Sequence, residues 1–339
     1  MKKKTIYVYI LATTILLFNL TSVQALDLTL TIQTDKENYL IGETVNIFGQ
    51  VLIDGQKVNE SLVGIQVNDP NNKAIIYRTY FIYEVENPPV LEGDLNGDGY
   101  VDIFDAVKIA LAFGAEYGDP NYDLTADINK DGIVDIFDMV VVAIHFGEGT
   151  PPHSWRIEII DTFIADYYGR PVSQAKRGSL YFIWVRFKNN QSNYIKANIT
   201  YTIYDSEGNP LYSDRVAQNV PPGGPHEFVS AFTVPTDAAL GTAKIYANAY
   251  SNLPQDKGYP HCPEKSSTFE IISSTASQKT SSTSITNTIQ QNESSYSTSF
   301  RLKTGIQTGT YTAHATAFCY TGVIILLSYN LTSFTVSSP

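Results

Sequence analysis

Two stretches of twelve residues, 94–105 and 127–138, concentrate the residue types that can do chemistry in this chain. Both are rich in Asp, Asn and Gly, and they begin 33 residues apart. They agree at positions 1, 3, 5, 6 and 8 to 12, which makes them the strongest internal repeat of the sequence. Oxygen-bearing side chains at alternate positions are typical of a loop that wraps around a metal ion.

Calcium explains the residue type at each of these positions. It is a hard cation that takes about six to eight oxygen ligands, and a twelve-residue loop can supply them. A sharp turn at position 6 favours glycine, which both loops have there. We therefore predict two calcium ions, held by side chains at positions 1, 3, 5, 9 and 12 and by a backbone carbonyl at position 7: Asp94, Asn96, Asp98, Tyr100, Asp102 and Asp105 in the first loop, and Asp127, Asn129, Asp131, Ile133, Asp135 and Asp138 in the second.

Each loop places four carboxylates within twelve residues, and these repel one another unless a cation lies among them. Two calcium ions would offset four of the eight negative charges. The repeat should therefore be loosely folded without the metal and compact with it. The alternative is a pair of polar turns without a ligand, which two tandem copies, each followed by an apolar stretch, argue against.

Spacing and chemistry together resemble the dockerin family, whose members carry two duplicated calcium loop–helix motifs. The resemblance covers residues 93–147. Asp105 and Asp138 at position 12 are similar to dockerins rather than to the Glu of EF-hands, and no apolar helix precedes either loop. The resemblance to dockerins implies calcium-dependent docking to a cohesin-like protein partner, often in assemblies that degrade polysaccharides.

Positions 10 and 11 depart from the best-known dockerins, in which small hydroxyl residues contact the cohesin. Here they are large and apolar, so the partner surface should be apolar too, which argues against a type I cohesin. The stretches that follow, 106–113 and 139–146, are apolar nearly all round and should form helices buried in the module or under a partner. The predicted partner-binding residues are Ile103, Phe104, Lys108, Ile136, Phe137 and Val141.

The rest of the chain predicts β-structure around this module. Residues 27–83 and 153–272 alternate apolar and polar residues between turn signals, which favours immunoglobulin-like sandwiches. Residues 35–45, 240–243 and 308–311 are similar to macroglobulin-type repeats of prokaryotic, archaeal-type surface proteins. The predicted fold class is therefore mainly β, with a small α-helical dockerin-like module that carries the two calcium loops.

The predicted order of domains has six parts. A signal peptide occupies 1–25, a β-sandwich 26–90, the dockerin-like module 91–150 and an immunoglobulin-like sandwich 151–272. A Ser/Thr-rich linker at 273–299 and a C-terminal β segment at 300–339 follow. Two alternatives stay open: the first and last β parts form one discontinuous sandwich, or each is a small β unit of its own.

The first 25 residues carry three lysines, an apolar run and small residues before a cleavage point after Ala25. We expect a secreted or cell-surface protein without a membrane span in the mature chain. Export makes glycosylation plausible at five sequons, and it leaves pairing of Cys262 with Cys319 open. The sequons are Asn59, Asn190, Asn198, Asn292 and Asn330.

Composition argues against several functions. The formal charge of −11 disfavours nucleic acid as a partner, and the five histidines lack metal-ligand spacing. No phosphate loop or nucleophile elbow appears, so we expect no enzyme activity. Two alternatives to docking remain: a surface-layer or adhesion protein in which the calcium module is a spacer, and an enzyme or a carbohydrate-binding module in 153–272. For the latter, the aromatic candidates are Trp155, Trp184, Tyr167, Tyr168 and Tyr181, which could equally pack in a core.

Overall fold

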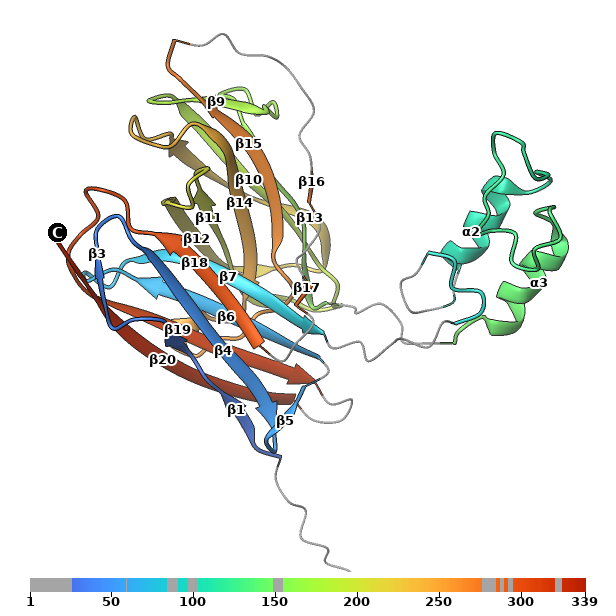
Figure 1. The fold of residues 1–339 in the computed structure, drawn as a ribbon, viewed down its shortest axis with the longest axis horizontal. Helices are drawn as coiled ribbons and strands as arrows, with labels where there is room; N and C mark the ends of the chain where they lie inside the picture. Colours follow the sequence, from blue (N-terminus) through green and yellow to red (C-terminus); the bar gives the residue numbers. More distant parts are fainter. Residues whose placement is uncertain are drawn as a thin grey trace, which may run out of the picture.

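The structure is a computed structural model that describes residues 26–58, 60–83, 91–96, 101, 103–148, 155–275, 285–286, 290–291, 295–320 and 325–339. The described part is mainly β, with two α-helices that lie together apart from the strands (Figure 1). The predicted fold class is confirmed: β-sandwiches joined to a small helical module. The predicted signal peptide lies outside the described residues.

The first sandwich draws its strands from both ends of the chain. Strand β18 (Ser295–Arg301) pairs with β4 along its whole length, and β19 (Gly309–Tyr320) lies between β6 and β20 (Ile325–Ser337). One sheet thus contains β1, β4 and β18, and the other runs β17-β7-β6-β19-β20-β3. The N-terminal strands are β1 (Leu28–Leu30), β2 (Gln33–Thr34), β3 (Asn38–Leu40), β4 (Thr44–Ile53), β5 (Gln56–Lys57), β6 (Glu60–Asn68) and β7 (Ala74–Tyr83).

This arrangement places residues 28–83 and 295–337 around one hydrophobic core, which includes Val45 and Ile65 from the first segment and Tyr311 and Phe334 from the second. The predicted linker 273–299 extended too far, because β18 begins at Ser295. Although Ser and Thr dominate its sequence, every second residue, such as Tyr296 and Thr298, is buried against the sheet. Two short strands, β16 (Ile285–Thr286) and β17 (Gln290–Gln291), also lie within the predicted linker.

The second sandwich packs a three-stranded sheet, β13-β10-β8, against a sheet ordered β12-β11-β14-β15-β16. Its core is built by alternation; in β10 the side chains of Tyr181, Ile183 and Val185 are buried while their neighbours face outward. The strands are β8 (Ile157–Ala165), β9 (Gln174–Lys176), β10 (Leu180–Asn189), β11 (Ile195–Tyr204), β12 (Pro210–Val220), β13 (Gly223–Thr233), β14 (Gly241–Tyr250) and β15 (Lys265–Ile272), with a 3-10 turn η1 (Pro254–Asp256).

Strand β7 of the first sandwich lies against the second sandwich and joins the two. The hydroxyl of Tyr250 donates to the carbonyl of Arg78 at 2.7 Å, and the Thr202 hydroxyl accepts from the backbone N–H of Tyr77 at 2.8 Å. Between them, the guanidinium of Arg78 makes a two-pronged ion pair with Glu264, with Nη2–Oε1 at 2.7 Å and Nε–Oε2 at 2.9 Å. Both side chains are buried, so the junction contains a desolvated and fully paired charge.

The two cysteines are free and buried, and each belongs to a different core. Burial raises the pKa of the Cys262 thiol to about 12 and that of Cys319 to about 11. Both thiols are therefore protonated near neutral pH and act as small apolar side chains.

The described sequons differ in their access to solvent. Asn198 is 4% exposed on β11, and its amide donates to the carbonyl of Ser251, so a glycan does not fit there in the folded chain. Asn190 and Asn330 are half-buried, and their amides donate to the carbonyls of Trp155 and Leu30. The other two predicted sites, Asn59 and Asn292, lie outside the described residues. Within the described part of the chain, neither helix is long and apolar enough to cross a membrane.

A buried histidine at the junction predicts a loss of stability in acid. Burial and the charge of Arg156 lower the pKa of His261 to about 4 from its ordinary value of 6.5. The unfolded chain therefore binds the proton first, and the free energy of unfolding falls as the pH drops from about 6.5 to 4. Between pH 7 and pH 4.5 the titration of His261 should lower the free energy of unfolding by roughly 2 to 3 kcal/mol. Urea unfolding at both pH values checks this, and the variant His261→Phe should lose less stability on acidification than the parent.

Candidate functional site

The helical module is built from α2 (Ile103–Ala112) and α3 (Ile136–His145), which contact each other. Its core is small and includes Val101, Ile109, Val134 and Val142. Both helices begin three residues earlier than the sequence predicted. For α3 the reason is a capping box, since Asp135 accepts from the N–H of Phe137 and donates its own N–H to Asp138.

Asp127, at position 1 of the second loop, carries the clearest sign of a metal ligand. Its side chain is almost fully buried, and Oδ2 accepts from the hydroxyl of Tyr122 at 2.5 Å and from the N–H of Gly132 at 3.0 Å. Its other oxygen, Oδ1, is buried and has no hydrogen-bond partner among the described residues. An unpaired carboxylate oxygen is costly inside a protein, and a cation in the loop would satisfy it.

Two opposing causes act on the pKa of Asp127. Burial acts to raise it, but hydrogen bonds from Tyr122 and from the loop backbone outweigh burial, and the pKa is lowered. The carboxylate is therefore ionised at neutral pH, as a calcium ligand must be.

The position-12 carboxylates occupy equivalent places in both loops. Asp105 and Asp138 are each fully buried. Oδ1 of Asp105 accepts from the N–H groups of Leu95 and Asn96, at 2.7 and 3.1 Å. Oδ1 of Asp138 accepts from the corresponding groups of the second loop, at 2.8 and 3.2 Å. Each carboxylate thus closes its loop onto the following helix, and its Oδ1 already accepts the two hydrogen bonds that one carboxylate oxygen can take.

The remaining groups of the second loop are bound to the loop itself. Asn129 accepts from the N–H of Asp131, and Asp131 accepts from the N–H of Ile133. In this conformation no three acidic, histidine or cysteine side chains of the described residues converge as a metal cluster. Oxygens from Asn129 and the carbonyl of Ile133 would have to complete a calcium shell around Asp127. The donor set, all oxygen and held in one loop, fits calcium.

The first loop is described only in part. Asp94, Asn96 and Asp105 are placed, and Lys108 of α2 donates to the carbonyl of Leu95 at 2.7 Å. The predicted ligands Asp98, Tyr100 and Asp102 lie outside the described residues. The first loop has the same hydrogen bonds at position 12 as the second loop, and this is the part of the loops that can be compared between the two copies.

The predicted partner-binding residues divide into two groups. Ile103, Phe104, Ile136 and Phe137 are exposed, with the two phenylalanines at 64% and 65%. Lys108 and Val141 are only half-buried, and Lys108 is engaged with the first loop, so its role is at least partly internal.

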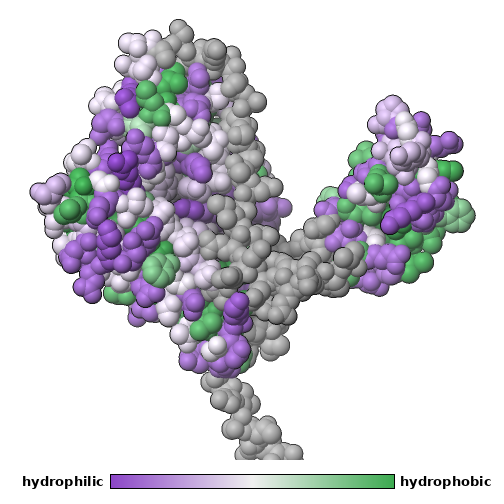
Figure 2. All heavy atoms as spheres, viewed as in Figure 1, coloured by the Kyte–Doolittle hydropathy of each residue, from purple (hydrophilic) through white to green (hydrophobic). Residues whose placement is uncertain are grey.

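The exposed apolar surface is larger than predicted. Further apolar side chains on the two helices, and at the residue just after each helix, are exposed to solvent, and each one in the first copy has a counterpart 33 residues later in the second. The 33-residue repeat of the loops, extended into the helices, would have predicted these matching apolar residues. We call the full set the twin apolar surface (Figure 2); it comprises Ile103, Phe104, Val107, Leu111 and Phe113 and their counterparts Ile136, Phe137, Val140, Ile144 and Phe146.

The aromatic residues considered for sugar binding do not form one face. Trp184 stacks on Phe163, with ring centroids 5.9 Å apart, on the outer side of the β8-β10-β13 sheet, and Tyr167 and Tyr168 are exposed nearby in sequence. Tyr181 is buried in the core. Trp155 lies elsewhere, against Phe81 of the first sandwich at 5.4 Å.

Comparison with known proteins identifies one part of the chain. Residues 92–146 match the sequence model of the family described as Dockerin type I domain. Dockerin modules are non-catalytic, bind calcium and dock to cohesins, and proteins that contain them are typically extracellular. No curated protein matches the chain.

Solved structures resemble the chain only distantly. A Paenibacillus cycloisomaltooligosaccharide glucanotransferase is 11% identical, with a TM-score of 0.26, over 35% of this chain and 14% of its own. The C-terminal domain of wzt is 14% identical, with a TM-score of 0.29, over 35% and 75%. A Listeria innocua β-glucosidase is 11% identical, with a TM-score of 0.24, over 37% and 17%. The chain thus spans only a small part of the two enzymes.

Proposed function

Since the chain joins a dockerin module to β-sandwich domains, we propose that it is an exported, non-catalytic protein that docks to a partner in a calcium-dependent manner. The module binds two calcium ions, one in each loop, and presents the twin apolar surface to a cohesin-like protein. Docking of the module attaches the two sandwich domains to an extracellular assembly.

The twin apolar surface is the observation that carries the proposal. Ten large apolar side chains, each at least 44% exposed, occupy equivalent places on the two helices and at the residue that follows each helix end. A module that acts only as a spacer has no need of such a surface, whose exposure is unfavourable in water. Because the exposed groups at positions 10 and 11 are Ile and Phe, the complementary partner surface is apolar rather than hydroxyl-rich.

Calcium is expected to control both folding and docking. In the presence of calcium the protein should bind a cohesin with an apolar docking face, and chelation with EGTA should abolish binding. At free calcium about 100 times the dissociation constant, the ion should stabilise the module by roughly 2.7 kcal/mol per site. Titration calorimetry measures ion number and partner affinity, and amide hydrogen exchange of residues 103–148 measures folding. A module that stays equally protected after chelation would contradict the proposal, and calcium-ordered folding without any partner would favour the spacer.

Removing the two exposed phenylalanines should separate docking from folding. The variant Phe104→Ser/Phe137→Ser should weaken partner binding by about 100-fold or more, since aromatic anchors dominate most interfaces. Both side chains are exposed, so calcium affinity should stay unchanged. Tyr194→Ser is the matched control, because Tyr194 is 69% exposed and belongs to the second sandwich, outside the module. Equal affinity of the double variant and the control would show that docking uses another surface.

A further inference from the structure

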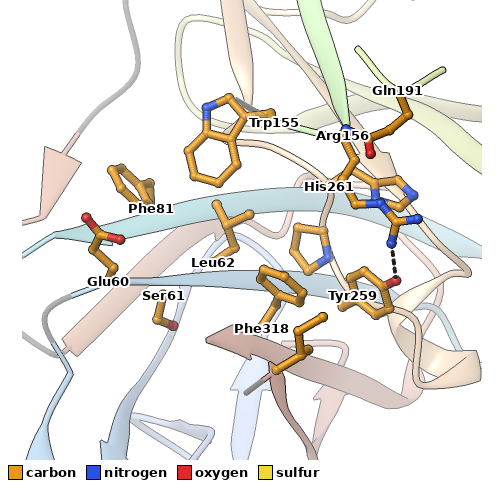
Figure 3. Close-up of a pocket in the computed structure, with 12 residues that line it drawn as sticks. Glu60, Ser61, Leu62, Phe81, Trp155, Arg156, Gln191, Tyr259, His261 and Phe318 are labelled. Atoms are coloured by element: carbon orange, nitrogen blue, oxygen red, sulfur yellow. Dashed lines mark hydrogen bonds between the residues drawn. The ribbon is translucent and has the colours of Figure 1, made fainter. Parts of the chain in front are cut away.

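A cavity of about 470 Å³ opens where the two sandwiches meet (Figure 3). Strands β6, β7, β19 and β20 of the first sandwich supply one part of its lining. The start of the second sandwich at Trp155 and the loop at Tyr259–His261 supply the other. Its volume lies within the range of about 300 to 1,000 Å³ that is usual for small-molecule sites.

Aromatic rings form the walls of this junction cavity. Phe81 meets Trp155 edge to face with ring centroids 5.4 Å apart, and Tyr259 stacks on Phe318 at 5.1 Å. Each pair joins one sandwich to the other, so the relative position of the walls is set by the domain junction. Trp155 and Tyr259 are only partly buried, which leaves ring surface for a ligand.

Polar groups of both kinds line the same cavity. Glu60 supplies acceptors, Gln191 supplies a donor and an acceptor, and the guanidinium of Arg156 donates to the hydroxyl of Tyr259 at 3.3 Å. His261 also lines the cavity, but it is 4% exposed and its ring nitrogens are buried, so the polar groups that a ligand would meet are those of Glu60, Gln191 and Arg156.

We infer that this junction cavity binds a neutral saccharide of one or two rings. Sugar hydroxyls both donate and accept, which matches a lining that mixes acceptors with donors. The apolar face of a pyranose ring packs flat on aromatic side chains such as Trp155 and Tyr259. The described lining residues include one cation and one anion, Arg156 and Glu60, whose charges balance, and this favours a neutral ligand over an ionic one. The inference is independent of docking, because the cavity lies between the sandwiches and its described lining residues all belong to them.

Fluorescence provides a direct test, because the chain has only two tryptophans. In the full-length variant Trp184→Phe, Trp155 is the sole tryptophan, and its emission should shift saturably on titration with a panel of neutral disaccharides such as cellobiose, maltose and laminaribiose. Calorimetry on the unmodified protein should give one site per chain. Absence of any saturable signal with every member of the panel would overturn the inference.

Variants localise the site. Trp155→Ala and Gln191→Ala should each weaken saccharide binding by about tenfold or more in calorimetry. Trp184→Ala should leave saccharide binding unchanged, because Trp184 lies on the outer face of the β8-β10-β13 sheet. The Phe104→Ser/Phe137→Ser variant should also bind saccharide normally, which distinguishes failure of this site from failure of docking. Loss of binding in Trp184→Ala with retention in Trp155→Ala would overturn the inference in favour of the outer aromatic face.

Discussion

Replacing Asp127 with Asn should eliminate calcium binding at the second loop and reduce partner affinity by about 100-fold or more. The substitution keeps the size of the side chain and one oxygen, but it removes the negative charge from a buried position of the loop, where Oδ1 has no hydrogen-bond partner among the described residues. Because calcium is expected to hold the loop against α3, its loss should also expose the Asp138 carboxylate and the N-terminus of that helix. Calorimetric titration should report one calcium ion per chain instead of two.

The control for this prediction is Asp119→Asn. Asp119 is exposed in the same module. Its carboxylate accepts a hydrogen bond from the N–H of Glu116. The substitution Asp119→Asn removes the same charge from a position outside both loops. The number of bound calcium ions and the partner affinity should therefore stay as in the parent. Two ions of unchanged affinity in Asp127→Asn would show that the second loop is not a calcium site.

The sequence predicted the helical module better than any other part, because a metal loop imposes a residue type at nearly every position. In the second loop, Asp127 at position 1 and Asp138 at position 12 are both buried and accept hydrogen bonds from the loop backbone, and their role as calcium ligands stays a prediction. The start of α3 was missed by three residues, because Asp135 was treated only as a ligand. It also caps the helix, and Ile136 and Phe137 therefore belong to the first turn.

The sandwiches were predicted as a class, but the joining of 26–90 with 300–339 in one sandwich was only one of two open alternatives. Alternation of apolar and polar residues indicates a strand without naming its neighbour, since β4 would look the same whether it paired with β18 or with another strand. Strand β12 gives little apolar alternation, because its residues from Leu211 to Asn219 are exposed or half-buried and the strand lies at a sheet edge. Contacts between residues distant in sequence, such as Arg78 with Glu264, leave no periodic signal at all.

The Arg78–Glu264 pair predicts the largest loss of stability outside the calcium loops. The carboxylate of Glu264 accepts from Nε and Nη2 of Arg78 and from the backbone N–H of Thr79, and the guanidinium lies over the ring of Tyr246 at 3.7 Å. Burial acts to lower the pKa of Arg78, but Glu264 outweighs it and holds the pKa above its usual value. Glu264→Gln therefore leaves a buried cation without its counter-ion, which should lower the free energy of unfolding by about 3 to 5 kcal/mol.

An exposed ion pair at the same junction offers the matched comparison. Arg301 and Glu207 also join the two sandwiches, at 2.6 Å, but their side chains are 42% and 54% exposed. Glu207→Gln should therefore cost less than about 1 kcal/mol. Urea unfolding of both variants and the parent measures the difference. Replacing the buried pair together, as Arg78→Met/Glu264→Leu, should recover much of the loss, because no charge is then left buried. If the two single variants were equally mild, solvent would have to reach the buried pair, and the junction could not be the rigid connection that fixes the walls of the cavity.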